Sequence, residues 1–247
     1  MKAAAVIQAR LNSTRLRSKA LLPLCGIPMI QHVIERAKLI SGTSVVILAT
    51  GTGIDNDPLE DIAGNCGITI FRGPENDVLE RYYRAAENIQ CDYVIRITGD
   101  NPLTDHIAAS RALTYAREKG ADHCTTSGIP LGTGVEVIRK TALEKAFREG
   151  IEPHHREHVT PYIKEHPELF RIEKYSSRMD NPFPDLRLTV DTEEDFKLMT
   201  EIYNRLYRGK PIEPEEVIDL IRREPELRLI NSGVEQRPMT HHSNGKK

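Results

Sequence analysis

Residues 3–19 read AAAVIQARLNSTRLRSK, a short apolar run that passes directly into a basic loop. The run at residues 3–7 has the length and composition of a buried strand. The loop at residues 8–19 carries four cations and no carboxylate: Arg10, Arg15, Arg17 and Lys19. Small polar residues between them let a turn direct its N–H groups at an anion, and arginine adds paired donors that match phosphate oxygens. The stretch predicts a phosphate-binding loop, most simply for a nucleoside triphosphate.

A basic loop can also be a solvated stretch of surface without a ligand. The position of this loop counts against that alternative, because ligands of open α/β sheets gather at the carboxyl ends of the strands. Four cations on one short loop also repel one another, and water screens that repulsion only in part. The predicted nucleotide contacts in this part of the chain are Ala9, Arg10, Ser13, Thr14, Arg15 and Lys19.

The chain that follows the loop alternates helices and strands as far as about residue 118. Apolar periodicity predicts helices at 29–38, 57–65, 78–88 and 104–118, and strands at 44–49, 69–71 and 93–97. Thr104 is predicted to cap the last of these helices. Such alternation gives an α/β fold with a mostly parallel, doubly wound sheet and right-handed crossovers.

The pattern becomes mixed from residue 122 onward. Strands are predicted at 123–127, 135–139, 170–175 and 186–190. Helices are predicted at 141–149 and 214–223, and a long helix is predicted between them that ends at about residue 207. Thr192 and Asp195 resemble a capping box with aspartate in place of the usual Glu or Gln. We predict one domain over residues 1–231, with a nucleotide-binding half at about 1–120 and an acceptor-binding half at about 121–231. The polar, aperiodic stretch 232–247 is predicted to be disordered.

Composition limits the class of protein. A length of 247 residues fits one large α/β domain, and a formal charge of -2 argues against a dedicated nucleic-acid binder. The four cysteines form no C-x-x-C pair, which disfavours a disulfide scaffold or zinc module and fits a reducing compartment. The sequence shows neither an apolar run of membrane-spanning length nor a secretion signal. We therefore expect a soluble cytoplasmic protein without nucleic-acid or membrane partners.

Two aspartates, Asp100 and Asp191, each follow a predicted strand. Because ligands of such sheets gather at strand ends, both should face the same crevice as the basic loop. Mg²⁺ accompanies a nucleoside triphosphate and takes one or two carboxylates, an arrangement that serves metal-assisted phosphoryl or nucleotidyl transfer. The structural alternatives are a turn residue before proline for Asp100 and an acid at a helix N-terminus for Asp191. We predict that both bind the metal.

The segment 154–158 reads HHREH and invites a metal-site interpretation. His154 and His158 are four residues apart and would share a helix face, but the pattern is not H-E-x-x-H. With Arg156 and Glu157 between the histidines, the start of a surface helix or a pocket for an anionic substrate is the preferred interpretation over zinc.

Four segments together carry a family resemblance: QARLNSTRLRSKALLPLCGIPMIQHVIER, TGDNPL, REHVTPYI and LRLTVDTEEDF. In this order they resemble the spore-coat polysaccharide biosynthesis protein F type of cytidylyltransferase. That group is similar to the acylneuraminate and deoxy-octulosonate cytidylyltransferases, which make CMP-activated acidic sugars. The resemblance covers residues 2 to about 234. It implies a glycosyltransferase-A-like nucleotide-binding fold, CTP as substrate, Mg²⁺ as cofactor and a homodimer.

The resemblance also implies roles for single residues. Arg10 and Lys19 match loop residues that hold the triphosphate, Asp100 matches the metal aspartate, and Asp191 matches a second acidic position near the C-terminal helix. A second loop, with Arg72, Asp77 and Arg81, is predicted to lie against the nucleoside. The first loop departs from the family pattern, which often has glycine, proline and glycine, at three positions: Asn12, Arg17 and Ser18.

The leading hypothesis is nucleotidyl transfer in surface polysaccharide biosynthesis. An acceptor oxygen attacks the α-phosphate of CTP, and Arg10, Lys19 and metal-bound Asp100 are the predicted catalytic residues. The acceptor is predicted to be a sugar acid or related anion. Its predicted contacts are Glu136, Arg156, His158 and Arg187. Two alternatives remain open: a glycosyltransferase that uses a finished nucleotide sugar, and a non-catalytic nucleotide-binding partner.

Overall fold

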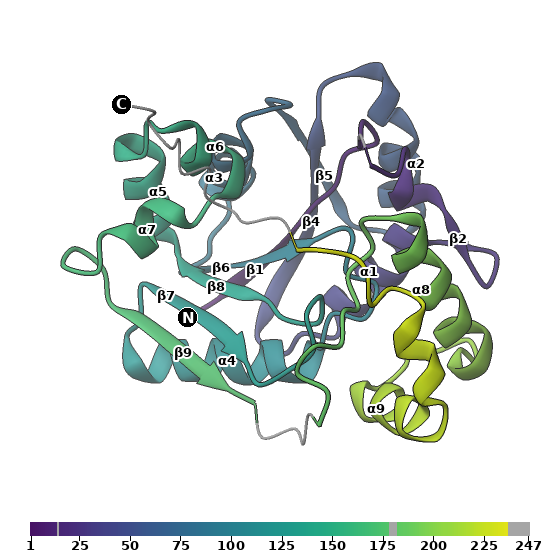
Figure 1. Ribbon diagram of the computed structural model, residues 1–247. Coiled ribbons are helices and arrows are strands. Elements are labelled where there is room, and N and C mark those ends of the chain that lie inside the picture. The colour runs from purple at the N-terminus through teal and green to yellow at the C-terminus, as the bar shows by residue number, and fades with distance from the viewer. Residues whose placement is uncertain (14, 178–181, 237–247) are drawn as a thin grey trace, which may run out of the picture.

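The computed structural model describes residues 1–13, 15–177 and 182–236 (Figure 1). In these residues one seven-stranded sheet runs in the order β5-β4-β1-β6-β8-β7-β9. Its strands are β1 (Ala3–Gln8), β4 (Thr43–Gly51), β5 (Thr69–Gly73), β6 (Tyr93–Thr98), β7 (His123–Ser127), β8 (Glu136–Arg139) and β9 (Ile172–Ser176). A separate hairpin joins β2 (Pro23–Leu24) to β3 (Ile27–Pro28).

The first half of the sheet is parallel, as predicted. β1 lies between β4 and β6 and pairs in parallel with both, and β5 pairs in parallel with β4. Gln8, the last residue of β1, lies opposite Ala49 and Thr98. The strands β1, β4 and β6 therefore end at one edge of the sheet, and the loops that leave them lie next to one another.

The second half of the sheet is mixed. β8 runs antiparallel to both β6 and β7, and β9 runs parallel to β7. Because β8 is inserted between β6 and β7, side chains from the two halves of the chain meet in adjacent strands. Arg96 of β6 lies directly opposite Glu136 of β8.

Helices cover both faces of the sheet. One hydrophobic core packs β1 against α1 (Met29–Lys38), α2 (Asp57–Asn65) and α4 (His106–Lys119). The opposite core contains α3 (Val78–Glu87), α5 (Lys140–Glu149) and α7 (Pro161–Glu165), and the short α6 (Pro153–His158) precedes α7. This is the doubly wound arrangement that the strand–helix alternation predicts.

A third core holds the C-terminal helices α8 (Glu193–Leu206) and α9 (Pro214–Arg223). They pack with Leu24 of the β2–β3 hairpin and with Leu186, Leu188 and Val190. In Figure 1 α8 lies beside β2 at the edge of the molecule, and α9 packs against α8. As a result, residues 186–190, which precede α8, lie near the carboxyl ends of β1 and β6.

The predicted strand at 186–190 is wrong. The segment forms only an isolated bridge, between Leu131 and Arg187. Its backbone bonds instead reach loops: Leu188 N donates to Leu131 O at 2.7 Å and Val190 N donates to Asp100 O at 2.9 Å. The alternating apolar residues Leu186, Leu188 and Val190 are buried against α8 and α9. Their alternation therefore reflects burial and not pairing with a neighbouring strand.

The helix caps give one correction and one confirmation. Asp105, not Thr104, caps α4, since its side chain accepts from Ala108 N at 2.8 Å, whereas Thr104 Oγ1 donates to Asn101 O. The capping box of Thr192 and Asp195 at the start of α8 is confirmed.

Three sequence predictions concern residues outside these elements. Thr14 and residues 237–247 of the predicted tail lie outside the described residues. The first residues after Asn231 are described, and Val234 N donates to Asn231 O at 3.0 Å. In the part of the chain that is described, no helix combines the length and the apolar character that crossing a membrane would require.

Candidate active site

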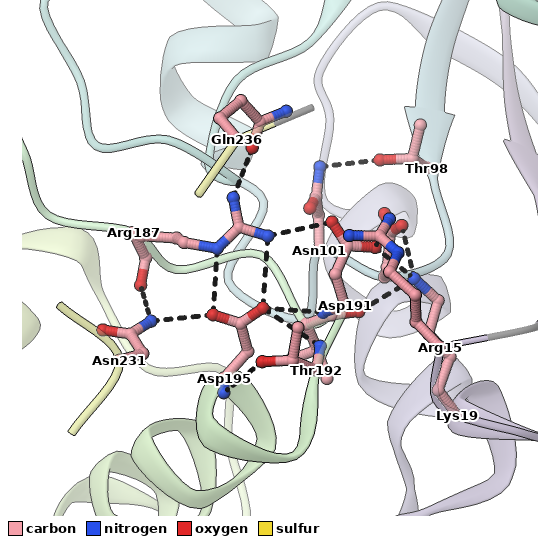
Figure 2. A network of polar contacts seen from close by, with 12 residues as sticks. Arg15, Lys19, Thr98, Asn101, Arg187, Asp191, Thr192, Asp195, Asn231 and Gln236 are labelled. Carbon is pink, nitrogen blue, oxygen red and sulfur yellow. Dashed lines mark hydrogen bonds and ion pairs between the residues drawn. The ribbon is translucent and has the colours of Figure 1, made fainter. Parts of the chain in front are cut away.

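Lys19 lies at the centre of a polar cluster where β1 and β6 end (Figure 2). Its ammonium nitrogen Nζ donates at 2.8 Å to each of three oxygens: Asp100 Oδ2, Asp191 Oδ1 and the backbone oxygen of Val190. The Lys19 side chain is 15% exposed. Burial alone would lower the pKa of Lys19, but the carboxylates of Asp100 and Asp191 raise it above its ordinary value. The ammonium is therefore charged and bridges the two aspartates.

Asp191 has cations on both of its carboxylate oxygens. Oδ1 contacts Lys19 and also Arg15, whose Nη2 lies 3.0 Å away. Oδ2 accepts from Arg187 Nη2 at 2.9 Å. Burial would raise the pKa of Asp191, but the charges of Lys19, Arg15 and Arg187 lower it below its ordinary value. Asp191 is thus held ionised.

Arg187 is buried, with 6% of its surface exposed, and is bound on every side. Its Nε donates to Asp195 Oδ1 at 2.9 Å, its Nη2 to Asp195 Oδ2 at 3.1 Å, and its Nη1 to the side chain of Gln236. The guanidinium therefore faces Asp191 and Asp195. Its predicted contact with an acceptor stays a prediction.

Asp195 and Asn231 complete this cluster, and sequence reasoning did not place either of them in the site. Asp195 Oδ2 accepts from the backbone nitrogens of Asp191 and Thr192, at 3.0 and 3.1 Å. Asn231 Nδ2 donates to Asp195 Oδ1 at 2.8 Å and to the backbone oxygen of Arg187 at 3.1 Å. The capping-box pattern located Asp195 at the helix start, but nothing in the sequence links it to Arg187.

The basic loop is closed at its base. Leu11 N donates to Asn56 Oδ1 at 3.0 Å, and Ser18 N donates to Leu11 O at 3.0 Å. Ser18 has φ 52, in the left-handed region that glycine adopts with least strain. Ala9 is buried and Ser13 half-buried, while Arg10 and Arg17 are exposed.

The second predicted loop is held by its own side chains. Arg72 contacts Asp57 at 2.7 Å and Glu60 at 3.0 Å, both on α2. Asp77 caps α3 by accepting from Glu80 N at 2.8 Å. Arg81 is buried and its Nη1 donates to the backbone oxygen of Pro74 at 2.8 Å. The predicted contacts of Arg72, Asp77 and Arg81 with the nucleoside stay predictions.

Glu136, a predicted acceptor contact, belongs to a second buried ion cluster. It contacts Arg96 Nη1 at 2.9 Å, His123 Nε2 at 3.3 Å and Lys164 Nζ at 2.5 Å. Thr160 Oγ1 also donates to it at 3.1 Å. Burial would raise the pKa of Glu136, but the charge of Arg96 and the hydrogen bond from His123 hold it well below its ordinary value. The oxygens of Glu136 are thus occupied by side chains of the protein itself. The predicted contact between Glu136 and an acceptor stays a prediction.

The remaining predicted acceptor contacts lie on α6. Arg156 is half-buried, with Nη1 3.4 Å from Asp77 Oδ2, and its guanidinium lies 5.2 Å from the ring centre of Phe147. His158 is half-buried near the end of the helix. Arg156 thus connects α6 to the cap of α3, so a predicted acceptor contact lies next to a predicted nucleoside contact, Asp77.

His155 takes part in the capping box at the start of α6, together with Glu152. His154 and His155 both contact Glu165, each at 2.8 Å, so their ligand atoms could gather around a metal. However, His155 Nδ1 accepts from Glu152 N at 3.3 Å, so its hydrogen is on Nε2. A metal on Nε2 would move that hydrogen to Nδ1, against the Glu152 N–H. The contacts agree with the preferred interpretation of a helix start.

The donor set around Lys19 suits Mg²⁺. Two carboxylate oxygens and one carbonyl oxygen already surround one cation, the Lys19 ammonium, at 2.8 Å. Mg²⁺ is a hard cation that prefers such oxygen ligands. Asp100 and Asp191 could therefore hold it once the ammonium has moved aside.

Comparisons with known proteins identify the family of the chain. The sequence profile of a family described as Cytidylyltransferase matches residues 4–235. The chain is 30% identical over 226 residues to the spore coat polysaccharide biosynthesis protein SpsF of Bacillus subtilis, covering 90% of this chain and 94% of that protein. It is 37% identical over 140 residues to a 3-deoxy-manno-octulosonate cytidylyltransferase of Chloroherpeton thalassium, covering 56% of this chain and 55% of that protein.

A solved structure shows the same fold over nearly the whole length. It is a cytidylyltransferase from Leptospira borgpetersenii, with a TM-score of 0.85 and 29% sequence identity. The match covers 92% of this chain and 96% of that one.

Proposed function

The chain belongs to the cytidylyltransferase family, and we propose that it transfers CMP from CTP to a sugar acid or related anionic acceptor. Pyrophosphate is the second product. The proposed setting is surface polysaccharide or glycoconjugate biosynthesis, as the name of the Bacillus subtilis relative states for that protein. The acceptor class follows the Chloroherpeton thalassium relative, whose name states a sugar acid.

One observation carries the proposal: oxygens of Asp100 and Asp191 converge on a single cation, the ammonium of Lys19 at the end of the basic loop. Both aspartates would hold Mg²⁺, which supplies positive charge to the phosphate oxygens when bound. The loop would hold the triphosphate through Arg10, Arg15 and Lys19. The carboxylates would bind the positively charged metal, and the loop cations would bind the negatively charged triphosphate.

The protein's part in the reaction is positioning and charge stabilisation. The acceptor oxygen forms a bond to the α-phosphorus, and the bond from that phosphorus to the β-phosphate oxygen breaks. Arg10 and Lys19 stabilise the charge on the departing pyrophosphate, because charge-assisted hydrogen bonds to phosphate oxygens are strong. Arg156 and His158 are the proposed acceptor contacts.

Three further features belong to the same proposal. The metal is Mg²⁺, in line with the oxygen-only donor set. The enzyme acts in the cytoplasm and forms a homodimer, as the family resemblance implies. Size-exclusion chromatography with light scattering tests the dimer.

A pyrophosphate-release screen of CTP and Mg²⁺ against sugar acids and sugar phosphates tests the reaction. The proposal predicts pyrophosphate together with a CMP adduct of one anionic acceptor. Release of a free nucleoside diphosphate from a nucleotide sugar would instead identify a glycosyltransferase. CTP binding without turnover on any acceptor would identify a non-catalytic binding protein.

A further inference from the structure

Arg187 approaches Asp191 from the side opposite the basic loop (Figure 2). Lys19 and Arg15 contact one oxygen of the Asp191 carboxylate, and Arg187 contacts the other, at 2.9 Å. The two sides differ in exposure. The Arg15 side chain is 33% exposed and belongs to the loop, whereas the Arg187 side chain is 7% exposed and paired with Asp195. Asp191 is therefore held by one fixed cation and by two cations from the loop.

The proposed function requires the two loop cations to change partners. Lys19 and Arg15 cannot hold a triphosphate while they hold Asp191. At present three carboxylates, of Asp100, Asp191 and Asp195, face three cations, of Lys19, Arg15 and Arg187. When Lys19 and Arg15 leave, two negative charges stay uncompensated, and one divalent cation balances them.

We propose that Arg187 is the positioning residue that keeps Asp191 in place for the metal when Lys19 and Arg15 turn to the triphosphate. This inference rests on the proposed function. Arg187 fixes Asp191 Oδ2, which leaves Oδ1 as the oxygen that faces the metal. Asp195 fixes Arg187 in turn, and it also holds the backbone nitrogen of Asp191 at 3.0 Å. Partners of this kind orient metal ligands in many proteins.

The shape of arginine is essential to this role. The guanidinium gives two donors to Asp195 and shares Nη2 with Asp191, so one rigid planar group makes three contacts. Lysine has the same charge but offers a single mobile point charge. Arg187→Lys should therefore keep the charge of the cluster and lose the orientation of Asp191.

Binding of Mn²⁺ alone, followed by electron paramagnetic resonance, tests the proposal without turnover. Arg187→Lys should weaken Mn²⁺ binding by about 10- to 100-fold, the usual effect of losing such a partner. In steady-state assays its KM for Mg²⁺ should rise, while kcat at saturating Mg²⁺ recovers toward that of the wild type. A residue with a purely structural role would not separate these two constants.

Two further variants sharpen the test. Lys19→Met removes the cation that competes for the two aspartates, so its affinity for Mn²⁺ alone should equal or exceed that of the wild type. Arg36→Lys is the matched control, since Arg36 is also buried and its guanidinium donates to the backbone oxygens of Thr104 and Ile212, outside the Asp191 cluster. It should lower thermal stability and leave Mn²⁺ affinity unchanged.

Asp195→Asn provides a second route if Arg187→Lys does not fold, because it keeps the side-chain shape and removes half of the pairing of Arg187. It too should weaken Mn²⁺ binding. Wild-type Mn²⁺ affinity in a folded Arg187→Lys or Asp195→Asn protein would overturn the inference, as would an equal loss in Lys19→Met. Failure of the wild type itself to bind Mn²⁺ would instead count against the proposed function.

Discussion

Asp191 and Glu136 are two buried carboxylates at different places in the molecule, 12% and 13% exposed. Each contacts at least two cationic side chains. The cations around Glu136 come from regular elements: Arg96 from β6 and Lys164 from α7. Of the three cations around Asp191, Arg15 comes from the irregular part of the basic loop, and Lys19 stands at the end of that loop, where a short 3-10 helix (Lys19–Leu21) begins.

This difference separates a structural ion cluster from a candidate site. Strands and helices fix the backbone on which Arg96 and Lys164 stand, so the elements themselves keep both cations near Glu136. Lys19 and Arg15 belong to a loop whose other cations reach solvent. By burial and charge alone, the clusters around Glu136 and Asp191 look alike. They differ in the segments of chain that supply their cations.

Glu136→Gln should give the largest effect on stability. The substitution leaves Arg96 buried without its carboxylate, and breaking a buried pair in this way costs about 3–5 kcal/mol. Urea denaturation monitored by circular dichroism measures the loss. Asp191→Asn is the matched control and should lose less, since Arg187 keeps Asp195. Equal stability of the wild type and Glu136→Gln would remove the distinction between the clusters.

The pH dependence of this effect has a definite sign. The folded-state pKa of Glu136 lies well below its ordinary value, so the ion cluster stabilises the fold fully above the unfolded pKa, about 4.3. The stabilisation is lost as pH falls from there through the folded pKa. The stability difference between the wild type and Glu136→Gln should therefore shrink in acid.

Asp100→Asn and Asp191→Asn should lower turnover by about 10²- to 10³-fold, the usual effect of removing one group that stabilises developing charge. Each change keeps the size of the side chain and removes a charge from the proposed metal site. Pyrophosphate release over a Mg²⁺ titration measures the effect. Wild-type rates in both variants would show that the cluster at Asp191 is structural, like the one at Glu136.

Lys19→Ala and Arg10→Ala should each weaken CTP binding, by about 1.5–3 kcal/mol or roughly tenfold and more, because each removes a charge-assisted phosphate contact. Isothermal calorimetry measures the affinity. Arg17→Ala is the control, since it removes the same charge from the same loop at a residue that is not among the predicted nucleotide contacts. Unchanged CTP affinity in Lys19→Ala and Arg10→Ala would exclude the loop from the mechanism.

The sequence predicts the parallel half of the fold well, because its evidence is local. Apolar periodicity places α1 at residues 29–38, the bounds that the structure shows. The strand-end rule also predicts that Lys19 and Asp100 lie together, because β1 and β6 end side by side. Asp191 lies with them although no strand precedes it. The strand at 186–190 fails because alternating apolar residues indicate burial, and burial does not specify whether the covering element is a strand or a helix.

The partners of single side chains are harder to predict. Arg187 pairs with Asp195 eight residues away, but also with Asn231 and Gln236, which the fold returns from a distant part of the chain. The sequence likewise gives no sign that the antiparallel register places Glu136, a predicted acceptor contact, opposite Arg96. Such contacts depend on register and on the packing of the C-terminal segment, which no local pattern encodes.

Nucleotide selectivity tests the central claim, that this chain is a CTP-dependent transferase. Cytosine presents an N4 amino donor where uracil presents an acceptor, and an unpaired buried polar group costs about 1–3 kcal/mol. Calorimetric titration with CTP, UTP, ATP and GTP at one Mg²⁺ concentration measures the difference. The account predicts that CTP binds at least about tenfold more tightly than each of the others. Tighter binding of UTP or GTP would contradict it.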